Sequence, residues 1–407
     1  MKILFVVPYV PSRIRIRPYE FIRWLGRQGH SVTVATQWSR PEEQADLDEI
    51  RTYCDQVVAV KLPVWRPILN SALALPGGTP LQSVYSWNPS LAQKLLSLTD
   101  GKNSVSKFDI AHVEHLRGVQ FGLFLKQYGN IPVVWDSVDC ISLLFQQSAK
   151  SNPRRVSRML NQFDLPRTKA FERKIVHQFT RTLVTSPVDR QAFLDLQPAG
   201  GPVPEIEVVP QGVDLEYYKP ADIKREPDTI VVSGKMSYHA NIRMVLHLLS
   251  EIMPRVWQQR PLVKVWVVGK DPSSEILQLA QDQRIIVTGA VDDMRPYLQK
   301  ATVAVAPTRY GAGIQNKVLE AMACGTPVVA SLGAVSALQA KEGEDVITAD
   351  SPQEFADEII KILQDPTSAN RIGNAGRSYV EKHHQWMAIV NKLESIYTDV
   401  IVEEGKN

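Results

Sequence analysis

One stretch of the chain, residues 303–331, constrains the fold more than any other. It reads VAVAPTRYGAGIQNKVLEAMACGTPVVAS, which is an apolar run, a loop with two glycines, a helix-compatible run and a second apolar run. The helix has a clear end because Gly325 favours helix termination and Pro327 cannot continue a helix. Strand, loop, helix and strand in this order predict a right-handed βαβ unit of a parallel sheet. Loop and helix N–H groups would then form an anion site.

The same stretch has a purely structural interpretation, because any α/β domain contains such a turn. Its functional interpretation rests on a resemblance. LEAMACGTPVVAS, residues 319–331, resembles the donor-site signature of retaining family 4 glycosyltransferases with the GT-B fold. In that family a Glu, a glycine loop and a second Glu eight positions later precede this motif. The second Glu matches Glu320, about two turns into the predicted helix, and the first falls on Ala312.

The variant GIQNKVLEAMA is similar to a subgroup of exopolysaccharide-type sugar transferases that also lack the first carboxylate. The resemblance implies an α/β protein with two Rossmann-like, doubly wound domains that face a cleft, and a C-terminal helix that crosses back to the first domain. We expect an N-terminal acceptor-binding domain at 1–215, joined by the returning helix at about 387–407. A linker at 216–228 and a donor-binding domain at 229–386 complete this expectation.

Length and composition agree with this organisation. The chain has 407 residues, which suits two domains of about 200 residues each. Its three cysteines are widely spaced without a CxxC pair, as expected in a reducing compartment and unlike a zinc site. No run approaches the ~18 apolar residues of a membrane span, and the N-terminal apolar run is too short for a signal peptide. We therefore expect a cytoplasmic protein, at most peripheral at the inner membrane face.

Charge divides the chain unevenly. Residues 1–200 hold 25 Lys and Arg against 16 Asp and Glu, and the remainder holds 21 against 27. The basic half could face an anionic membrane or a phosphorylated acceptor, or its charge could simply be spread over solvated surfaces. Segment 65–90 is a loop-rich apolar excursion that could contact a lipid-linked acceptor or the membrane, or could be a plain insertion. Segment 150–178 includes a basic amphipathic helix that could lie on a membrane surface or form a solvated face.

The chain begins with a strand at 2–7, a helix at 18–29 and a strand at 30–36, which is a Rossmann-type start. In the family the first loop is rich in glycine and touches the donor diphosphate. Here the loop holds Arg13, Arg15 and Arg17. Alternating arginines would present one cationic face to a phosphate, or they would belong to an ordinary solvated loop.

Two further strands of the first domain end in polar residues. Ligands gather at the carboxyl ends of parallel strands, so Glu114, His115, Asp136 and Asp139 are candidate site residues. The family often has a His after the first of these strands, near the transferred sugar. His115 is preferred over His112 for this position because it lies further out.

In the second domain, the family has an Arg after a glycine turn and a Lys a few residues later, and both hold the donor diphosphate. Lys235 matches the Arg, but the Lys position falls on Ala240 or Asn241. We hypothesise that Lys317, where the family usually has an apolar residue, supplies the missing cation. The run VTGAV resembles the loop that holds the nucleotide base through backbone groups.

The resemblance thus implies a metal-independent, retaining glycosyltransferase that uses a nucleotide-diphosphate sugar, UDP- or GDP-linked, and no cofactor or nucleic acid. Its acceptor would be a glycan, a lipid-linked molecule or a small molecule, in polysaccharide or glycoconjugate synthesis. The alternatives are a non-catalytic nucleotide-sugar-binding protein and a sugar-nucleotide epimerase of the same fold. The expected catalytic residues are Lys235, Lys317 and His115; the donor-binding residues are Gly234, Gly311, Gly313, Ile314, Gln315, Asn316, Glu320, Gly289 and Val291; and the acceptor or phosphate side comprises Arg13, Arg15, Arg17, Glu114 and Asp136.

Overall fold

The computed structural model describes residues 1–99, 108–151, 155–308 and 314–405. The chain divides into two compact units. Unit 1 comprises Met1–Pro210 and Trp386–Asn407, and unit 2 comprises Gln211–Gln385. The division comes after Pro210, five residues before the end of the predicted first domain. The predicted linker, 216–228, lies inside unit 2, and its last three residues already belong to a strand of the sheet.

Unit 1 is built on a seven-stranded sheet with the order β3-β2-β1-β4-β5-β6-β7, in which every pairing is parallel. This order is the doubly wound arrangement expected from the sequence. Its strands are β1 (Lys2–Val7), β2 (Ser31–Trp38), β3 (Gln56–Lys61), β4 (Ile110–Glu114), β5 (Val133–Val138), β6 (Arg181–Val184) and β7 (Ile206–Val208).

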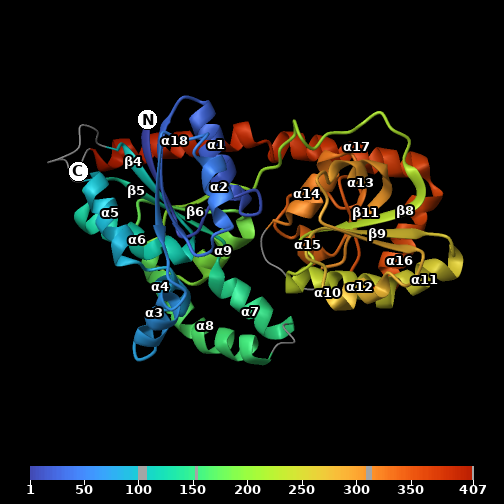
Figure 1. The fold of residues 1–407 in the computed structure, drawn as a ribbon, viewed down its shortest axis with the longest axis horizontal. Coiled ribbons are helices and arrows are strands. Elements are labelled where there is room, and N and C mark those ends of the chain that lie inside the picture. The colour runs from blue at the N-terminus through green and yellow to red at the C-terminus, as the bar shows by residue number, and fades with distance from the viewer. Residues whose placement is uncertain (100–107, 152–154, 309–313, 406–407) are drawn as a thin grey trace. The chain divides into compact units, whose positions relative to one another are not determined.

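The helices of unit 1 cover both faces of this sheet (Figure 1). They are α1 (Ile16–Arg27), α2 (Glu43–Ile50), α3 (Arg66–Ala74), α4 (Leu81–Tyr85), α5 (Pro89–Thr99), α6 (His115–Tyr128), α7 (Ile141–Ser151), α8 (Arg155–Ile175), α9 (Pro187–Asp195) and α18 (Trp386–Glu404). The central strands β1 and β4 are buried along almost their whole length, as expected where helices cover both faces of a parallel sheet.

The C-terminal helix α18 packs on unit 1, which confirms the expectation of a returning helix. Trp386 is buried with its ring against Phe21 of α1, at a centroid separation of 5.6 Å. Ile389, Leu393 and Ile396 of α18 belong to the same core. These residues recur at the three- and four-residue spacing of a helix face, so the last helix buries its apolar side on the first sheet.

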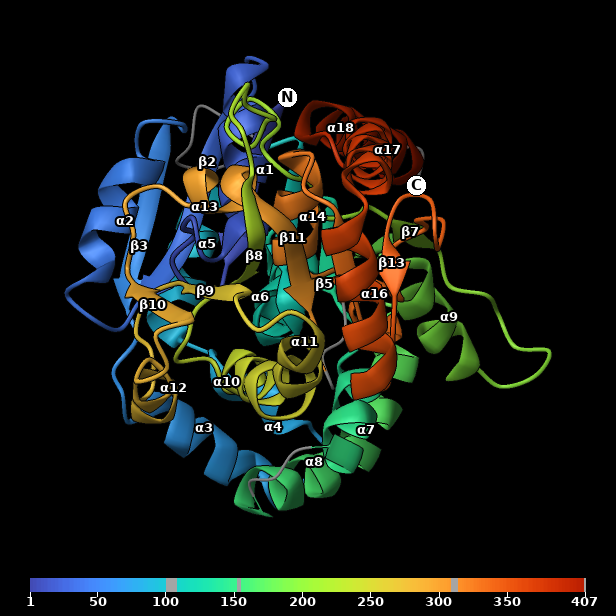
Figure 2. The same ribbon diagram turned by 90° about the vertical axis from the view of Figure 1, so that its right-hand side faces the viewer.

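Unit 2 has a six-stranded sheet in the order β10-β9-β8-β11-β12-β13, again with parallel pairings throughout (Figure 2). Its strands are β8 (Glu226–Ser233), β9 (Lys264–Val268), β10 (Ile285–Gly289), β11 (Ala301–Ala306), β12 (Val328–Ala330) and β13 (Ile347–Thr348). The βαβ unit predicted for 303–331 is β11, α14 and β12, and β11 and β12 are neighbours in the sheet.

The helices of unit 2 form two apolar cores, one on each face of the sheet. They are α10 (His239–His247), a single π-helical turn (Leu248–Ile252), α11 (Met253–Gln259), α12 (Ser274–Leu279), α13 (Arg295–Lys300), α14 (Asn316–Ala323), α15 (Leu332–Val335), α16 (Pro352–Gln364) and α17 (Pro366–His383). None of the described helices of either unit has the length and apolar character that crossing a membrane requires.

Two glycines bring the turns after β8 and β9 into direct contact. Gly269 has φ +149°, and a Cβ there would lie 1.8 Å from the carbonyl oxygen of Gly234. Any side chain at 269 must therefore displace the turn after β8. This turn begins the candidate site described below.

We predict that Gly269→Ala lowers the free energy of unfolding by about 2 kcal/mol or more, because strain at such a backbone position adds to a backbone clash. Gly333→Ala is the matched control, since its Cβ would meet nothing within 4 Å. Thermal unfolding of the two variants measures the difference. Equal stability of both variants would contradict the close approach of the two turns.

Candidate functional site

The first part of the candidate site is the turn after β8. Gly234 has φ +145°, and a Cβ there would lie 2.7 Å from Nδ2 of Asn241. Asn241, on the first turn of α10, is buried and donates from Nδ2 to the carbonyl oxygen of Lys235 at 3.0 Å. The side chain of Lys235 is exposed. Gly234 is thus required both for its backbone angle and for the approach of the Asn241 amide.

Lys317 joins this turn to the start of α14. Its Nζ donates to Oδ1 of Asn241 at 2.8 Å and lies 3.4 Å from Oε1 of Gln315. Asn241 therefore holds the turn with its amide group and the Lys317 ammonium with its carbonyl oxygen. Of the two positions where the expected Lys could fall, Ala240 is buried and Asn241 faces the turn. A cation is thus present beside Asn241, and it comes from α14.

The far end of α14 is held by two arginines. Arg377 donates from Nη1 to the carbonyl oxygen of Ala323 at 2.7 Å, and Arg225 donates from Nη2 to that of Gly325 at 2.7 Å. Carbonyl groups at a helix C-terminus lack partners within the helix, so these bonds satisfy them. They also fix α14 in position, and with it Lys317 at the other end of the helix.

Glu320 lies one helical turn beyond Lys317. Burial is the main cause that raises the pKa of Glu320 to about 7, and Lys317 opposes this shift. Burial likewise lowers the pKa of Lys317 to about 8, and Glu320 opposes that shift. Both charged forms are poorly solvated here, so both would gain from a ligand that supplies hydrogen bonds or opposite charge.

The remaining donor-side residues predicted near α14 lie at the start of this helix or outside the described residues. Ile314 packs against the apolar core beneath α14, and Asn316 begins this helix. Gly311, Gly313 and Ala312 lie outside the described residues.

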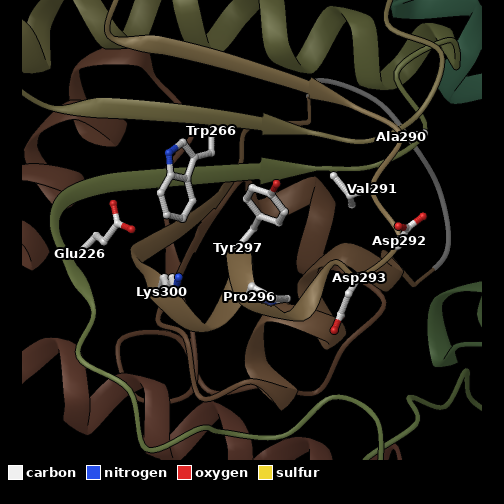
Figure 3. A pocket seen from close by; sticks show the side chains of 9 residues that line it. All are labelled: Glu226, Trp266, Ala290, Val291, Asp292, Asp293, Pro296, Tyr297 and Lys300. Atoms are coloured by element: carbon white, nitrogen blue, oxygen red, sulfur yellow. The ribbon is translucent and has the colours of Figure 1, made fainter.

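The loop after β10 borders a pocket of about 510 Å³ (Figure 3). Gly289 ends β10 with φ +68°, and Val291 lines the pocket. Trp266 of β9 and Tyr297 of α13 form its aromatic wall, with ring planes at 87° and centroids 5.6 Å apart. The pocket therefore combines this aromatic wall with charged side chains, Glu226, Asp292, Asp293 and Lys300, beside the loop expected to hold a nucleotide base.

The arginine loop of unit 1 does not present one cationic face, so this prediction is wrong. Arg17 turns into the core, where its Nε donates to Oδ2 of Asp136 at 2.8 Å and its Nη1 donates to the carbonyl oxygen of Val209. Arg13 is exposed and pairs with Glu49 at 2.8 Å. The three side chains diverge because α1 begins at Ile16, so Arg17 is already on a helix and Arg13 is still in the loop.

Asp136 is fully buried and holds a network together. It accepts from Arg17, and Nε2 of His112 lies 3.5 Å from the same carboxylate oxygen. The other ring nitrogen of His112 is 2.7 Å from the hydroxyl of Tyr397 on α18. The charge of Arg17 is the main cause that offsets burial and keeps the pKa of Asp136 below its usual value. His112 and Asp136 thus form a buried structural network, which leaves His115 as the accessible histidine.

His115 has φ +65° at the end of β4, an uncommon angle for a residue with a side chain. Its Nδ1 accepts from the backbone N–H of Arg117 at 3.2 Å, so the proton of the neutral ring is on Nε2. Burial and the charge of Arg117 lower the pKa of His115 to about 3. The ring is therefore neutral at pH 7 and can donate one hydrogen bond from Nε2.

Glu114 is also buried, and Oε1 accepts from the hydroxyl of Tyr9 at 2.9 Å. Burial, followed by the charge of Asp136, raises the pKa of Glu114 to about 8. The guanidinium of Arg15 lies 4.8 Å from the centroid of the Tyr9 ring. Asp139 is partly buried, and this burial, with the charge of Asp189, raises its pKa to about 7. Glu114 and His115 at the carboxyl end of β4 are therefore largely neutral at pH 7, whereas Asp136 of β5 stays ionised beside Arg17.

Two residues of these sites escaped the sequence analysis. Tyr9 follows β1 as part of an apolar-looking run, and Asn241 appeared only as a place where a cation was missing. Each could have been found from its position at the carboxyl end of a strand or the start of the following helix. Within the described ranges, no group of three or more His, Cys, Asp or Glu side chains is arranged to hold a metal ion.

Both halves of the chain match family models of glycosyltransferases. Residues 17–217 match the model described as "Glycosyltransferase Family 4", and residues 227–365 match "Glycosyl transferases group 1". Among curated proteins, a D-inositol 3-phosphate glycosyltransferase of Frankia alni is 24% identical over 299 residues, covering 67% of this chain and 70% of the relative.

Solved structures show the same fold. Sucrose-phosphate synthase from Thermosynechococcus elongatus aligns with a TM-score of 0.71 at 18% identity, over 99% of this chain and 100% of the other. Anabaena HepE in complex with UDP aligns with a TM-score of 0.69 at 15% identity, over 98% and 100%. The chain has the GT-B fold, and both of its sheets belong to glycosyltransferase domains.

The raised pKa of Glu320 predicts a pH-dependent stability. Folded Glu320 holds its proton up to about pH 7, above the ordinary value of 4.5, so its ionisation destabilises the fold as pH rises through this interval. Glu320→Gln should therefore match the wild type at pH 4.5 and be more stable by about 1 kcal/mol at pH 8.

Thermal unfolding at the two pH values measures this difference. Glu344→Gln, which removes one exposed negative charge, is the control. A stability gain for Glu320→Gln that is the same at both pH values would contradict the assignment of the effect to ionisation.

Proposed function

We propose that this GT-B glycosyltransferase moves a sugar from a nucleotide-diphosphate sugar to an acceptor hydroxyl with retained anomeric configuration, without a metal ion. The observation that carries the proposal is the position of Lys317, held by Asn241 between the turn after β8 and the start of α14. This is an anion site with one partly buried cation. Its place at the carboxyl ends of β8 and β11 is where α/β sheets bind ligands.

The reaction needs stabilisation of a leaving diphosphate. The bond from the anomeric carbon to the diphosphate oxygen breaks with its electron pair on the oxygen, and the acceptor oxygen bonds to that carbon. The acceptor proton passes to the departing phosphate. Lys317, Lys235 and the N–H groups at the start of α14 would meet the developing negative charge. Lys317 is suited to this task because burial already disfavours its ammonium, so a diphosphate would be its best available partner.

The nucleoside would bind further along the same edge of unit 2. Glu320 would accept hydrogen bonds from ribose hydroxyls once ionised, a change that the nearby Lys317 favours. The loop from Gly289 to Val291 would hold the base through backbone groups, beside the aromatic wall of Trp266 and Tyr297. That HepE, a structure of the same fold, was solved with UDP supports a nucleoside diphosphate as the ligand class.

Unit 1 would bind the acceptor. The neutral ring of His115 would donate from Nε2 to a sugar hydroxyl, and Glu114, protonated near neutral pH, would stay uncharged beside it. Arg15 is the one arginine of the three still suited to an acceptor phosphate, although it also pairs with Glu43. We place the reaction in cytoplasmic polysaccharide or glycoconjugate synthesis, with a glycan or lipid-linked acceptor.

A second candidate is nucleotide-sugar binding without transfer, which Ala312 favours because relatives contact the donor sugar with a carboxylate there. Mass spectrometry of UDP-, GDP- and TDP-sugars incubated with the protein separates the candidates. Nucleoside diphosphate released only with added acceptor glycans supports transfer. Binding without release would show a non-catalytic protein, and an isomerised donor would show an epimerase.

We predict that Lys317→Ala lowers turnover about 100-fold, the usual effect of removing one donor to a developing oxyanion. Lys317→Arg should retain part of the activity because the positive charge remains. Unchanged turnover in Lys317→Ala would contradict the role given to this side chain.

The lowered pKa of Lys317 predicts a pH dependence of binding. Its charge is lost as pH rises through about 8, so UDP and GDP should bind more weakly at pH 9.5 than at pH 7. Arginine stays charged throughout this range, so Lys317→Arg should show little change. Calorimetric titration at the two pH values measures both. A parallel loss of affinity in the variant would assign the effect to another group.

A further inference from the structure

In helix α3 of unit 1, the apolar face is exposed to solvent and the buried face includes a polar residue. This is the reverse of the usual arrangement. The residues on its buried side include Asn70, whose Nδ2 donates to the carbonyl oxygens of Val84 and Trp87 at 3.0 and 2.8 Å. The opposite side is apolar and open to solvent, with Ile68 and Leu73 each 72% exposed. A helix on the surface of a globular protein normally buries its apolar face.

Helix α8 repeats this reversal. Three of its buried positions along one face are polar: Asp164, Thr168 and Glu172 follow each other at four-residue spacing, and the last residue of the helix, Ile175, is buried with them. Its exposed side includes Met159, Leu160 and Phe163, at 66%, 53% and 46% exposure. Glu172 accepts from the backbone N–H groups of α7 at 2.8 and 3.1 Å, so the inward direction of the polar face is fixed by hydrogen bonds.

The two helices are joined into one surface. Arg167 of α8 donates to the carbonyl oxygen of Leu75 at the end of α3, at 2.6 Å, and its guanidinium lies over the Phe163 ring. Asp164 accepts from the backbone N–H of Leu81 at the start of α4. Figures 1 and 2 both show α3, α4 and α8 lying together. We call the exposed side chains of Trp65, Ile68, Leu73, Met159, Leu160 and Phe163 the apolar tip.

The chain around the apolar tip has an unusual charge composition. Segments 56–99 and 140–163 contain seven Lys and Arg and no Asp or Glu, in a protein with 43 acidic residues overall. Exposed apolar side chains within a purely cationic stretch of sequence match the two attractions that hold interfacial helices on anionic membranes, which are apolar burial and charge.

We propose that the apolar tip docks unit 1 on a membrane surface containing anionic phospholipids. Large apolar side chains exposed in this number on linked helices point to an interaction site, and the charge decides between occupants. A second copy of this chain would place the same cationic segments opposite each other in a symmetric dimer, which is unfavourable. In a bilayer with anionic lipids, the apolar side chains would be buried among the lipids, and the Lys and Arg side chains would pair with the anionic headgroups. This inference does not depend on the proposed transfer reaction.

The test is co-sedimentation of the full chain with vesicles of phosphatidylcholine alone and with 30% phosphatidylglycerol, an anionic fraction of roughly the kind that attracts polybasic segments. We expect binding to the anionic vesicles, weaker binding at high salt, and at least about tenfold weaker binding to phosphatidylcholine alone. The variant Ile68→Ser/Leu73→Ser should lose at least about tenfold in affinity for anionic vesicles, because two exposed apolar side chains are removed.

Leu262→Ser is the matched control, since this leucine is 81% exposed but belongs to unit 2. It should bind vesicles as the wild type does. Thermal unfolding of all variants shows whether they fold, and the exposed positions should change it little. Absence of binding to anionic vesicles, or equal losses in Leu262→Ser, would overturn the proposal. So would a dimer, detected by light scattering, that dissociates in Ile68→Ser/Leu73→Ser, because this result would assign the apolar tip to a second copy.

Discussion

The hydrogen bond from Lys317 to Asn241 is the interaction on which the donor side of this structure depends. It joins two elements that are far apart in sequence, the start of α14 and the first turn of α10. Through the second bond of Asn241 it also reaches the turn after β8, whose shape requires Gly234 and the absence of a side chain at Gly269. Arg225 and Arg377 fix the other end of α14. One amide group therefore couples the turn after β8 to the Lys317 ammonium, the pair that we propose to bind a diphosphate.

The charged forms of Lys317 and Glu320 are less well solvated in this site than they would be in water. Burial lowers the pKa of Lys317 and raises that of Glu320, so each group would be more stable with a ligand than without one. Burial also shifts pKa values in unit 1. There it keeps the side chains of Glu114 and His115 largely neutral near pH 7. Under the proposed function, the ammonium of Lys317 suits a diphosphate leaving group, and the neutral side chains of Glu114 and His115 suit an uncharged hydroxyl acceptor.

The sequence was sufficient to predict what depends on local pattern. The apolar runs and Gly325 in 303–331 identified β11, α14 and β12, and the family resemblance implied the returning helix α18. It was insufficient where a side chain's partner lies far along the chain. The burial of Arg17 requires Asp136, 119 residues away, and the partner of the hypothesised cation Lys317 is Asn241, 76 residues away. The reversed faces of α3 and α8 were also hidden, because periodicity gives an apolar face but not its direction.

A double-mutant cycle on nucleoside diphosphate binding tests the central claim most directly. Calorimetric titration of UDP and GDP into the wild type, Lys317→Met, Asn241→Ala and the double variant gives the coupling between the two side chains. If Asn241 acts by holding Lys317 at the diphosphate, losing Asn241 should cost much less affinity once Lys317 is absent. Strictly additive losses, with folding intact, would contradict the account, because the two residues would then act independently on the ligand.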